Sequence, residues 1–324
     1  MLALTKLIIH KLTLLKLTVS VFLLILVSGT ALAQQDEKTT SAQKTPQTDV
    51  ASKSDGETKS NAIAIPSPIS LTQQHKADLK HYLPPDKVTP LLAGPDDYIT
   101  LITEYSSINN KGVAILLPDW QQGATSPKGI NFLRNTLPQQ GWTTMSIQPS
   151  SKPEGYPSKA LKMSELRQEN KIIIDAYKIK FNAMINAVID KSKEYPGMVI
   201  VIAQGHHGAL LVDLLAQQSS NQASTMVNAV ILLSSYVLTS DELSEQGNTH
   251  FAKTLAYSEY PVLDLYLRHD NPIVLDKTKQ RLALSKQEMK VYYRQRQLNN
   301  TAMGYYPEQE LLTQINSWLK SIGW

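Results

Sequence analysis

Short apolar runs alternate with helical patterns along most of the sequence, and no other feature constrains the fold as much. Runs typical of buried strands lie at residues 98–105, 113–117, 142–148, 198–203, 227–233, 261–267 and 291–298. Helix-like spacing of apolar residues lies between or after them, at residues 129–139, 164–193, 208–217 and 308–322. This alternation predicts an α/β fold with a mostly parallel central sheet and helices on both faces.

Two details refine this prediction. A tight turn at residues 108–112 joins the first two runs, so we expect strands 98–105 and 113–117 to form an antiparallel edge of the sheet. The helical pattern at 164–193 is long, and we expect it to be broken or bent.

The N-terminus has the pattern of an export signal. Three lysines precede an apolar stretch at residues 17–27, and Ala31-Leu32-Ala33 forms a small-x-small cleavage site. The apolar stretch is shorter than the roughly 20 residues of a spanning helix, so we expect cleavage after Ala33 rather than an uncleaved anchor. The sequence therefore predicts a periplasmic protein without a stable membrane span after cleavage.

Composition divides the remaining chain and excludes several function classes. After the signal peptide at 1–33, residues 34–68 contain no Phe, Trp or Tyr, which indicates a disordered, low-complexity tail at 34–71 before an α/β domain at 72–324. Without the lysines of the signal, 29 basic residues face 28 acidic ones, so we expect no nucleic-acid partner. The absence of Cys excludes a Cys nucleophile and thiolate zinc sites.

One strand-to-helix junction resembles the nucleophile elbow of α/β hydrolases. In VIVIAQGHHGALLVDLL, Ala203 takes the place of the first Gly of the G-x-S-x-G motif, Gly205 that of the Ser and His207 that of the last Gly. The degenerate elbow consists of Gln204, Gly205, His206, His207 and Gly208. Because Gly205 has no side-chain oxygen, the elbow has no attacking group.

The other hydrolase positions are also altered. Asp270 follows a late strand and matches the place of the catalytic acid, but the loop at 299–307, where such enzymes carry their His, contains none. Pro118-Asp119-Trp120 replaces the His-Gly of the oxyanion loop. A carboxylate at Asp119 would repel a developing oxyanion.

A narrower resemblance covers most of the predicted domain. It is carried by KGVAILLPDWQQG, INFLRNTLPQQGWTTMSIQ, VIAQGHHGA, PVLDLYLRHDNP and YYRQRQL. These blocks are similar to a proteobacterial, exported, α/β-hydrolase-like family of unknown function, domain-of-unknown-function family 3530, with a degenerate elbow. The resemblance implies a fold and an exported location, and it implies no activity.

Polar residues at the predicted sheet edge leave two interpretations open. His207, Asp119 and Asp270 could together bind a metal and activate water. Alternatively they hydrogen-bond the elbow loop, because neighbouring histidines on a helix point about 100° apart and seldom share one ion. We expect the second arrangement, with no metal and no cofactor. Trp120 and Ser234 are candidate ligand contacts.

Two functions therefore remain. The missing Ser and His favour a non-catalytic binding or assembly module of the cell envelope, whose partner is an unknown small molecule or envelope component. The alternative is an unorthodox periplasmic hydrolase of an ester or glycan substituent that uses His207, Asp119 and Asp270. Whether the chain is an enzyme is left open by the sequence.

Overall fold

The computed structural model describes residues 68–220, 227–237 and 247–324. These residues belong to one compact unit, Ile65–Trp324. The predicted signal peptide at 1–33 lies outside the described residues, and so does the predicted tail up to residue 67. The first described helix begins at Leu71.

In the described part of the chain, eight strands form one sheet in the order β1-β2-β4-β3-β5-β6-β7-β8. The strands are β1 Val88–Ala93, β2 Asp96–Thr103, β3 Gly112–Leu117, β4 Trp142–Gln148, β5 Met198–Gln204, β6 Ala229–Leu233, β7 Val262–Leu267 and β8 Tyr293–Leu298. Strands β3 to β8 are parallel to one another, whereas β2 runs antiparallel to both β1 and β4. This topology confirms the predicted α/β-hydrolase-like fold.

The antiparallel edge is made by other strands than we predicted. The strands at 98–105 and 113–117 do not pair, because β4 lies between β2 and β3. The edge is instead formed by β2 and β1, a strand that the sequence pattern does not reveal. Strand β1 contains Pro90, which has no N–H to donate and is therefore tolerated at the edge of a sheet.

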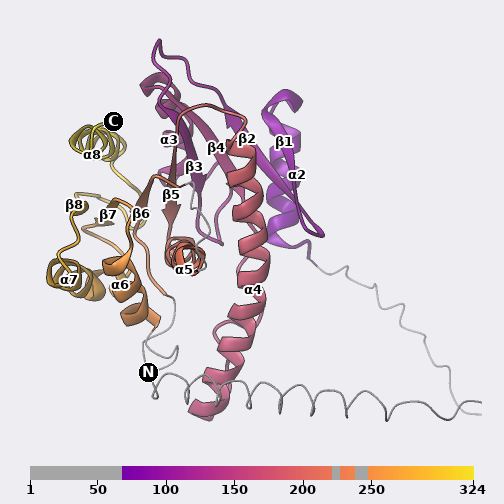
Figure 1. Cartoon of the computed structure of the whole chain (residues 1–324). Helices are drawn as coiled ribbons and strands as arrows, with labels where there is room; N and C mark the ends of the chain where they lie inside the picture. The colour runs from indigo at the N-terminus through magenta and orange to yellow at the C-terminus, as the bar shows by residue number, and fades with distance from the viewer. Residues whose placement is uncertain (1–67, 221–226, 238–246) are drawn as a thin grey trace, which may run out of the picture. The chain divides into compact units, whose positions relative to one another are not determined.

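Helices cover both faces of the sheet, as predicted (Figure 1). The α-helices are α2 Leu71–Tyr82, α3 Ile130–Thr136, α4 Met163–Ser192, α5 His206–Ser220, α6 Gly247–Tyr257, α7 Pro272–Gln287 and α8 Glu308–Ser321. Side chains of α4, α5 and α6 share one hydrophobic core with the sheet, and those of α3 and α8 share the other. Short 3-10 turns at Pro85–Lys87 and Leu137–Gln140 follow α2 and α3.

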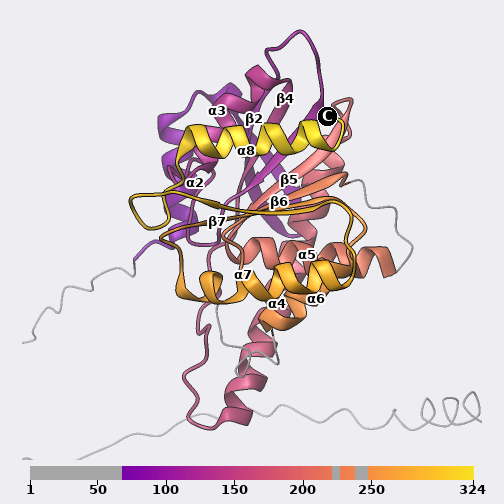
Figure 2. The same cartoon turned by 90° about the vertical axis from the view of Figure 1, so that its left-hand side faces the viewer.

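Helix α4 is continuous over 30 residues, which corrects the expected break at 164–193. Its C-terminal half buries Phe181, Ile185 and Val188 against the sheet. Its N-terminal half extends past the sheet and leaves Ile172 exposed (Figures 1 and 2). Packing of one half is enough to hold the helix, because a long helix propagates readily once part of it is fixed.

Candidate functional site at the degenerate elbow

The elbow is a sharp turn between β5 and α5. Gly205 has a φ of 59°, and its N–H donates to the carbonyl of Leu233 on the neighbouring strand at 2.9 Å. A residue with a side chain pays about 1–2 kcal/mol for this left-handed conformation. The sharp turn that presents the nucleophile in hydrolases is therefore present here, and glycine adopts its left-handed conformation without strain.

The side chain of Asp119 fills the space that a nucleophile would occupy. A Cβ atom added to Gly205 would lie 2.5 Å from the Asp119 Cγ and 2.7 Å from both carboxylate oxygens. Asp119 Oδ1 accepts a hydrogen bond from the backbone N–H of His206 at 3.0 Å. In a hydrolase, the N–H that follows the nucleophile belongs to the oxyanion hole. Here an internal carboxylate takes that donor.

Asp119 carries its negative charge in a mostly buried place. Burial by itself raises the pKa of Asp119. The hydrogen bonds from His206 and the electrostatic effects of His206 and His207 lower it by more, so the net pKa lies below its ordinary value. The carboxylate is therefore ionised at neutral pH. A second negative charge developing at the same spot would be repelled.

His206, rather than the predicted His207, is the histidine that contacts Asp119. Its Nδ1 lies 3.2 Å from Asp119 Oδ1. The imidazole stacks on Trp120 with ring centroids 4.1 Å apart and also contacts the Tyr236 ring at 4.3 Å. Its Nε2 is buried and has no hydrogen-bond partner among the described residues. The elbow pattern gave no signal that distinguished the two neighbouring histidines.

His207 points into the core. Its Nδ1 lies 2.5 Å from the carbonyl oxygen of Pro118, and its Nε2 lies 2.8 Å from the Tyr177 hydroxyl. Desolvation lowers the pKa of His207 to about 4, so the ring is neutral at pH 7. In that state Nδ1–H donates to Pro118 and Nε2 accepts from Tyr177. Both ring nitrogens are therefore engaged in holding the loop after β3 and helix α4.

Asp270 belongs to a separate hydrogen-bonded group after β7. It accepts from the Ser234 hydroxyl at 2.5 Å and from the backbone N–H groups of Leu267 and Asn271 at 2.8 and 2.7 Å. The Tyr306 hydroxyl donates to Ser234 Oγ at 2.6 Å. Desolvation raises the pKa of Asp270. Tyr306 lies in the loop where hydrolases carry their His, and we did not single it out from the sequence.

Within the described ranges, no hydrogen bond joins His207 to Asp119 or Asp270. The three candidates of the hydrolase hypothesis therefore do not form one hydrogen-bonded group, although Asp119 and His207 interact electrostatically. No group of three His, Asp or Glu side chains in the described ranges is arranged to hold a metal ion.

None of the described helices is long and apolar enough to cross a membrane.

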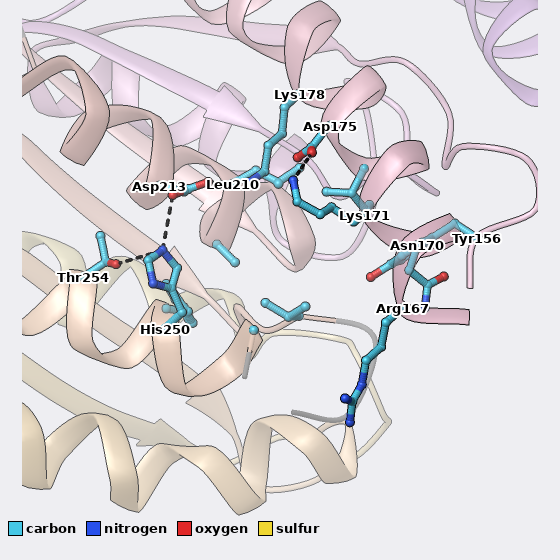
Figure 3. Close-up of a pocket in the computed structure, with 15 residues that line it drawn as sticks. Tyr156, Arg167, Asn170, Lys171, Asp175, Lys178, Leu210, Asp213, His250 and Thr254 are labelled. Atoms are coloured by element: carbon cyan, nitrogen blue, oxygen red, sulfur yellow. Dashed lines mark hydrogen bonds and ion pairs between the residues drawn. The ribbon is translucent and has the colours of Figure 1, made fainter. Parts of the chain in front are cut away.

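A cavity of about 360 Å³ lies beside the elbow, between α4, α5 and α6 (Figure 3). Trp120, a predicted ligand contact, is buried and does not line this cavity. Tyr156 does line it, and its ring packs edge-on against Trp120 with ring centroids 5.7 Å apart. On the cavity wall, Asp213 accepts from Lys178 at 2.6 Å and lies 3.5 Å from His250. These residues are far apart in the sequence, and no local pattern joins them.

Comparisons with known proteins support the family that the sequence resembles. The family described as "Protein of unknown function (DUF3530)" matches residues 15–321. No curated protein matches the sequence.

Several solved hydrolase structures are also similar to the chain. An α/β serine hydrolase homologue from Coxiella burnetii is 12% identical, with a TM-score of 0.49, and the match covers 75% of this chain and 100% of that one. Est1E from Butyrivibrio proteoclasticus is 12% identical with a TM-score of 0.49, covering 74% and 100%. A dienelactone hydrolase from Anabaena variabilis is 12% identical with a TM-score of 0.49, covering 72% and 94%.

Proposed function

The chain belongs to the DUF3530 family of proteins of unknown function, and from this premise we propose that it is a non-catalytic, α/β-hydrolase-like binding module of the cell envelope. The proposal rests on one observation, the Asp119 carboxylate that occupies the nucleophile space over Gly205. Loss of a single oxyanion donor lowers kcat by about 10²–10³-fold in a serine hydrolase. Here the attacking oxygen is missing as well, and a fixed negative charge stands in its place.

The loop that carries the catalytic His in hydrolases supports the same proposal. Tyr306 is buried there, and burial raises the pKa of Tyr306 well above its ordinary value, with a further increase from the Asp270 carboxylate. The phenol therefore stays protonated at neutral pH and donates to Ser234. It cannot accept a proton as a general base would.

Binding without chemistry needs a cavity, and the described residues provide one beside the elbow. Its volume of about 360 Å³ lies within the range of small-molecule sites. Leu210, Ile174 and Phe251 give it an apolar wall, and the Lys178–Asp213 pair gives it a polar one. We propose that the module holds a small molecule or a segment of another envelope component in this cavity, after export to the periplasm.

A hydrolase remains the alternative because of one feature of His206. A histidine oriented by a carboxylate is the usual general base, and the His206–Asp119 pair has this form. In this alternative His206 takes the role we first gave to His207. Against it, His206 Nε2 is buried, so a substrate cannot reach it in this conformation.

Hydrolysis of short and long acyl esters by the purified protein tests the proposal. We expect rates equal to buffer, with and without a chelator, and no change in an Asp119→Asn variant. Asp190→Asn, which alters an exposed carboxylate on α4 away from the cavity, is the matched control. A rate above buffer that falls in Asp119→Asn, but not in Asp190→Asn, while both variants keep the melting temperature of the unmodified protein, would establish an enzyme with its site at the elbow.

A further inference from the structure

A second cavity, of about 560 Å³, lies where β3 and β4 end, between α2, α3 and the loop that follows β3. The polar residues of its wall include Asp78, Gln122, Ser126, Lys128, Arg134 and Gln148. The carboxyl ends of parallel strands are the usual place for ligands in open α/β sheets. None of its lining residues belongs to the elbow or to the cavity in Figure 3.

Arg134 on α3 is the unusual residue of this wall. Its guanidinium is partly buried, and Nε and Nη2 donate to Asn131 Oδ1 at 3.3 and 3.0 Å. No carboxylate of the described chain lies within ion-pair distance of it. Asn131 therefore fixes the orientation of the guanidinium, and Nη1 and part of Nη2 have no hydrogen-bond partner within the described part of the chain.

A partly desolvated cation without a counter-ion is unfavourable. Burial lowers the pKa of Arg134, because it disfavours the charged form of the guanidinium. An oxyanion that entered the cavity could accept two parallel N–H bonds from the free edge of the guanidinium. Binding of an anion would thus offset the cost of burying the charge.

The rest of the wall suits a hydroxyl-bearing ligand. Ser126 Oγ donates to Gln122 Oε1 at 2.5 Å, and Gln148 Oε1 accepts from the backbone N–H of Ala124 at 3.0 Å. These hydrogen bonds hold the two amides in fixed orientations. Lys128 adds a second cation whose ammonium lies 5.7 Å from the centre of the Tyr305 ring, and Asp78 is the acidic residue of this wall.

We propose that this cavity binds a small, hydroxyl-bearing molecule through a carboxylate or phosphate group held by Arg134. Guanidinium recognises both anions, while the Gln122 amide, whose orientation Ser126 fixes, faces the neutral part of the ligand. The proposal goes beyond the function given above. It holds whether or not the elbow is catalytic.

Calorimetry at low salt, with three probes titrated into the whole protein, tests this site. Glucuronate supplies a carboxylate, glucose 6-phosphate supplies a phosphate, and glucose is the neutral control. We expect at least one anionic probe to bind more tightly than glucose. Arg134→Gln should weaken that binding by about tenfold to a hundredfold, the usual worth of a hydrogen bond to a charged group.

Two further variants make the result specific. Arg134→Lys keeps the charge but loses the planar pair of donors, so it should bind with an intermediate affinity; it also serves if Arg134→Gln does not fold. Arg296→Gln, at an exposed arginine on β8, should bind like the unmodified protein. The proposal is overturned if glucose binds as well as the anions, if no anionic probe binds, or if Arg134→Gln and Arg134→Lys both retain full affinity.

Discussion

At the scale of single residues, Gly205 and Asp119 depend on each other. The missing side chain at position 205 makes room for a carboxylate, and the carboxylate satisfies the N–H of His206 at the start of α5. A negative charge at a helix N-terminus is favourable by about 0.3–1 kcal/mol. The contact that fills the space over Gly205 therefore also stabilises the elbow.

Gly205→Ala should lower the free energy of unfolding by about 2–4 kcal/mol, because the added methyl group meets Asp119 and the backbone is left-handed. Gly94→Ala is the matched control: Gly94 has a φ of 62° and no atom within 4 Å of an added Cβ. It should cost only the backbone part, about 1–2 kcal/mol. Urea unfolding measures both values.

A double-mutant cycle isolates the contact itself. Asp119→Ala alone loses the acceptor of the His206 N–H and should cost about 1–3 kcal/mol. Combined with Gly205→Ala it removes the clash, so the double variant should cost about 1–3 kcal/mol less than the sum of the two single-variant costs. Strict additivity would mean that Asp119 does not occupy the nucleophile space in solution.

At the scale of elements, a buried ion pair joins β7 to α7. Asp264 on β7 is fully buried and accepts from Arg281 Nε at 2.8 Å, from the Tyr293 hydroxyl at 2.8 Å and from Gln295 Nε2 at 2.9 Å. Arg281 is also buried and lies over the Phe251 ring of α6. One carboxylate thus fixes β8, α7 and α6 relative to β7.

Arg281→Met should destabilise the protein by about 3–5 kcal/mol, since it leaves a buried carboxylate without its cation. Lys162→Met removes an exposed ion pair with Glu165 and should change the stability by no more than about 1 kcal/mol. The double variant Asp264→Leu with Arg281→Met should recover only part of the loss, because it also removes the acceptor of the Tyr293 hydroxyl. Equal, small effects of the two single substitutions in thermal unfolding would show that the pair does not hold α7.

At the scale of the whole molecule, we propose that the chain works in the periplasm. Cleavage after Ala33 predicts a mature protein that begins at Gln34 and is released with the periplasmic contents of a Gram-negative cell. Intact mass of the fractionated protein measures this directly. Ala33→Leu should block cleavage and keep the chain in the membrane fraction. A full-length mass for the unmodified protein would instead establish an uncleaved anchor.

Local periodicity was sufficient for much of the fold. The predicted strands at 142–148, 198–203 and 261–267 agree with β4, β5 and β7 to within a residue, because a buried strand shows itself in a short apolar run. Strand β1 was missed, since only two of its six residues are buried and Pro90 interrupts it. The pairing of β2 with β4 was also missed, since strand neighbours are set by contacts distant in the sequence.

By itself, the sequence determined the fold class and placed a glycine at the turn between β5 and α5. Only the tertiary structure decided which side chain fills the space over that glycine. It placed Asp119 over Gly205, turned His206 toward Asp119 and turned His207 into the core. The physical reason is that side chains about 100° apart on a helix meet different surroundings, and those surroundings come from β3 and α4, which are distant in the sequence.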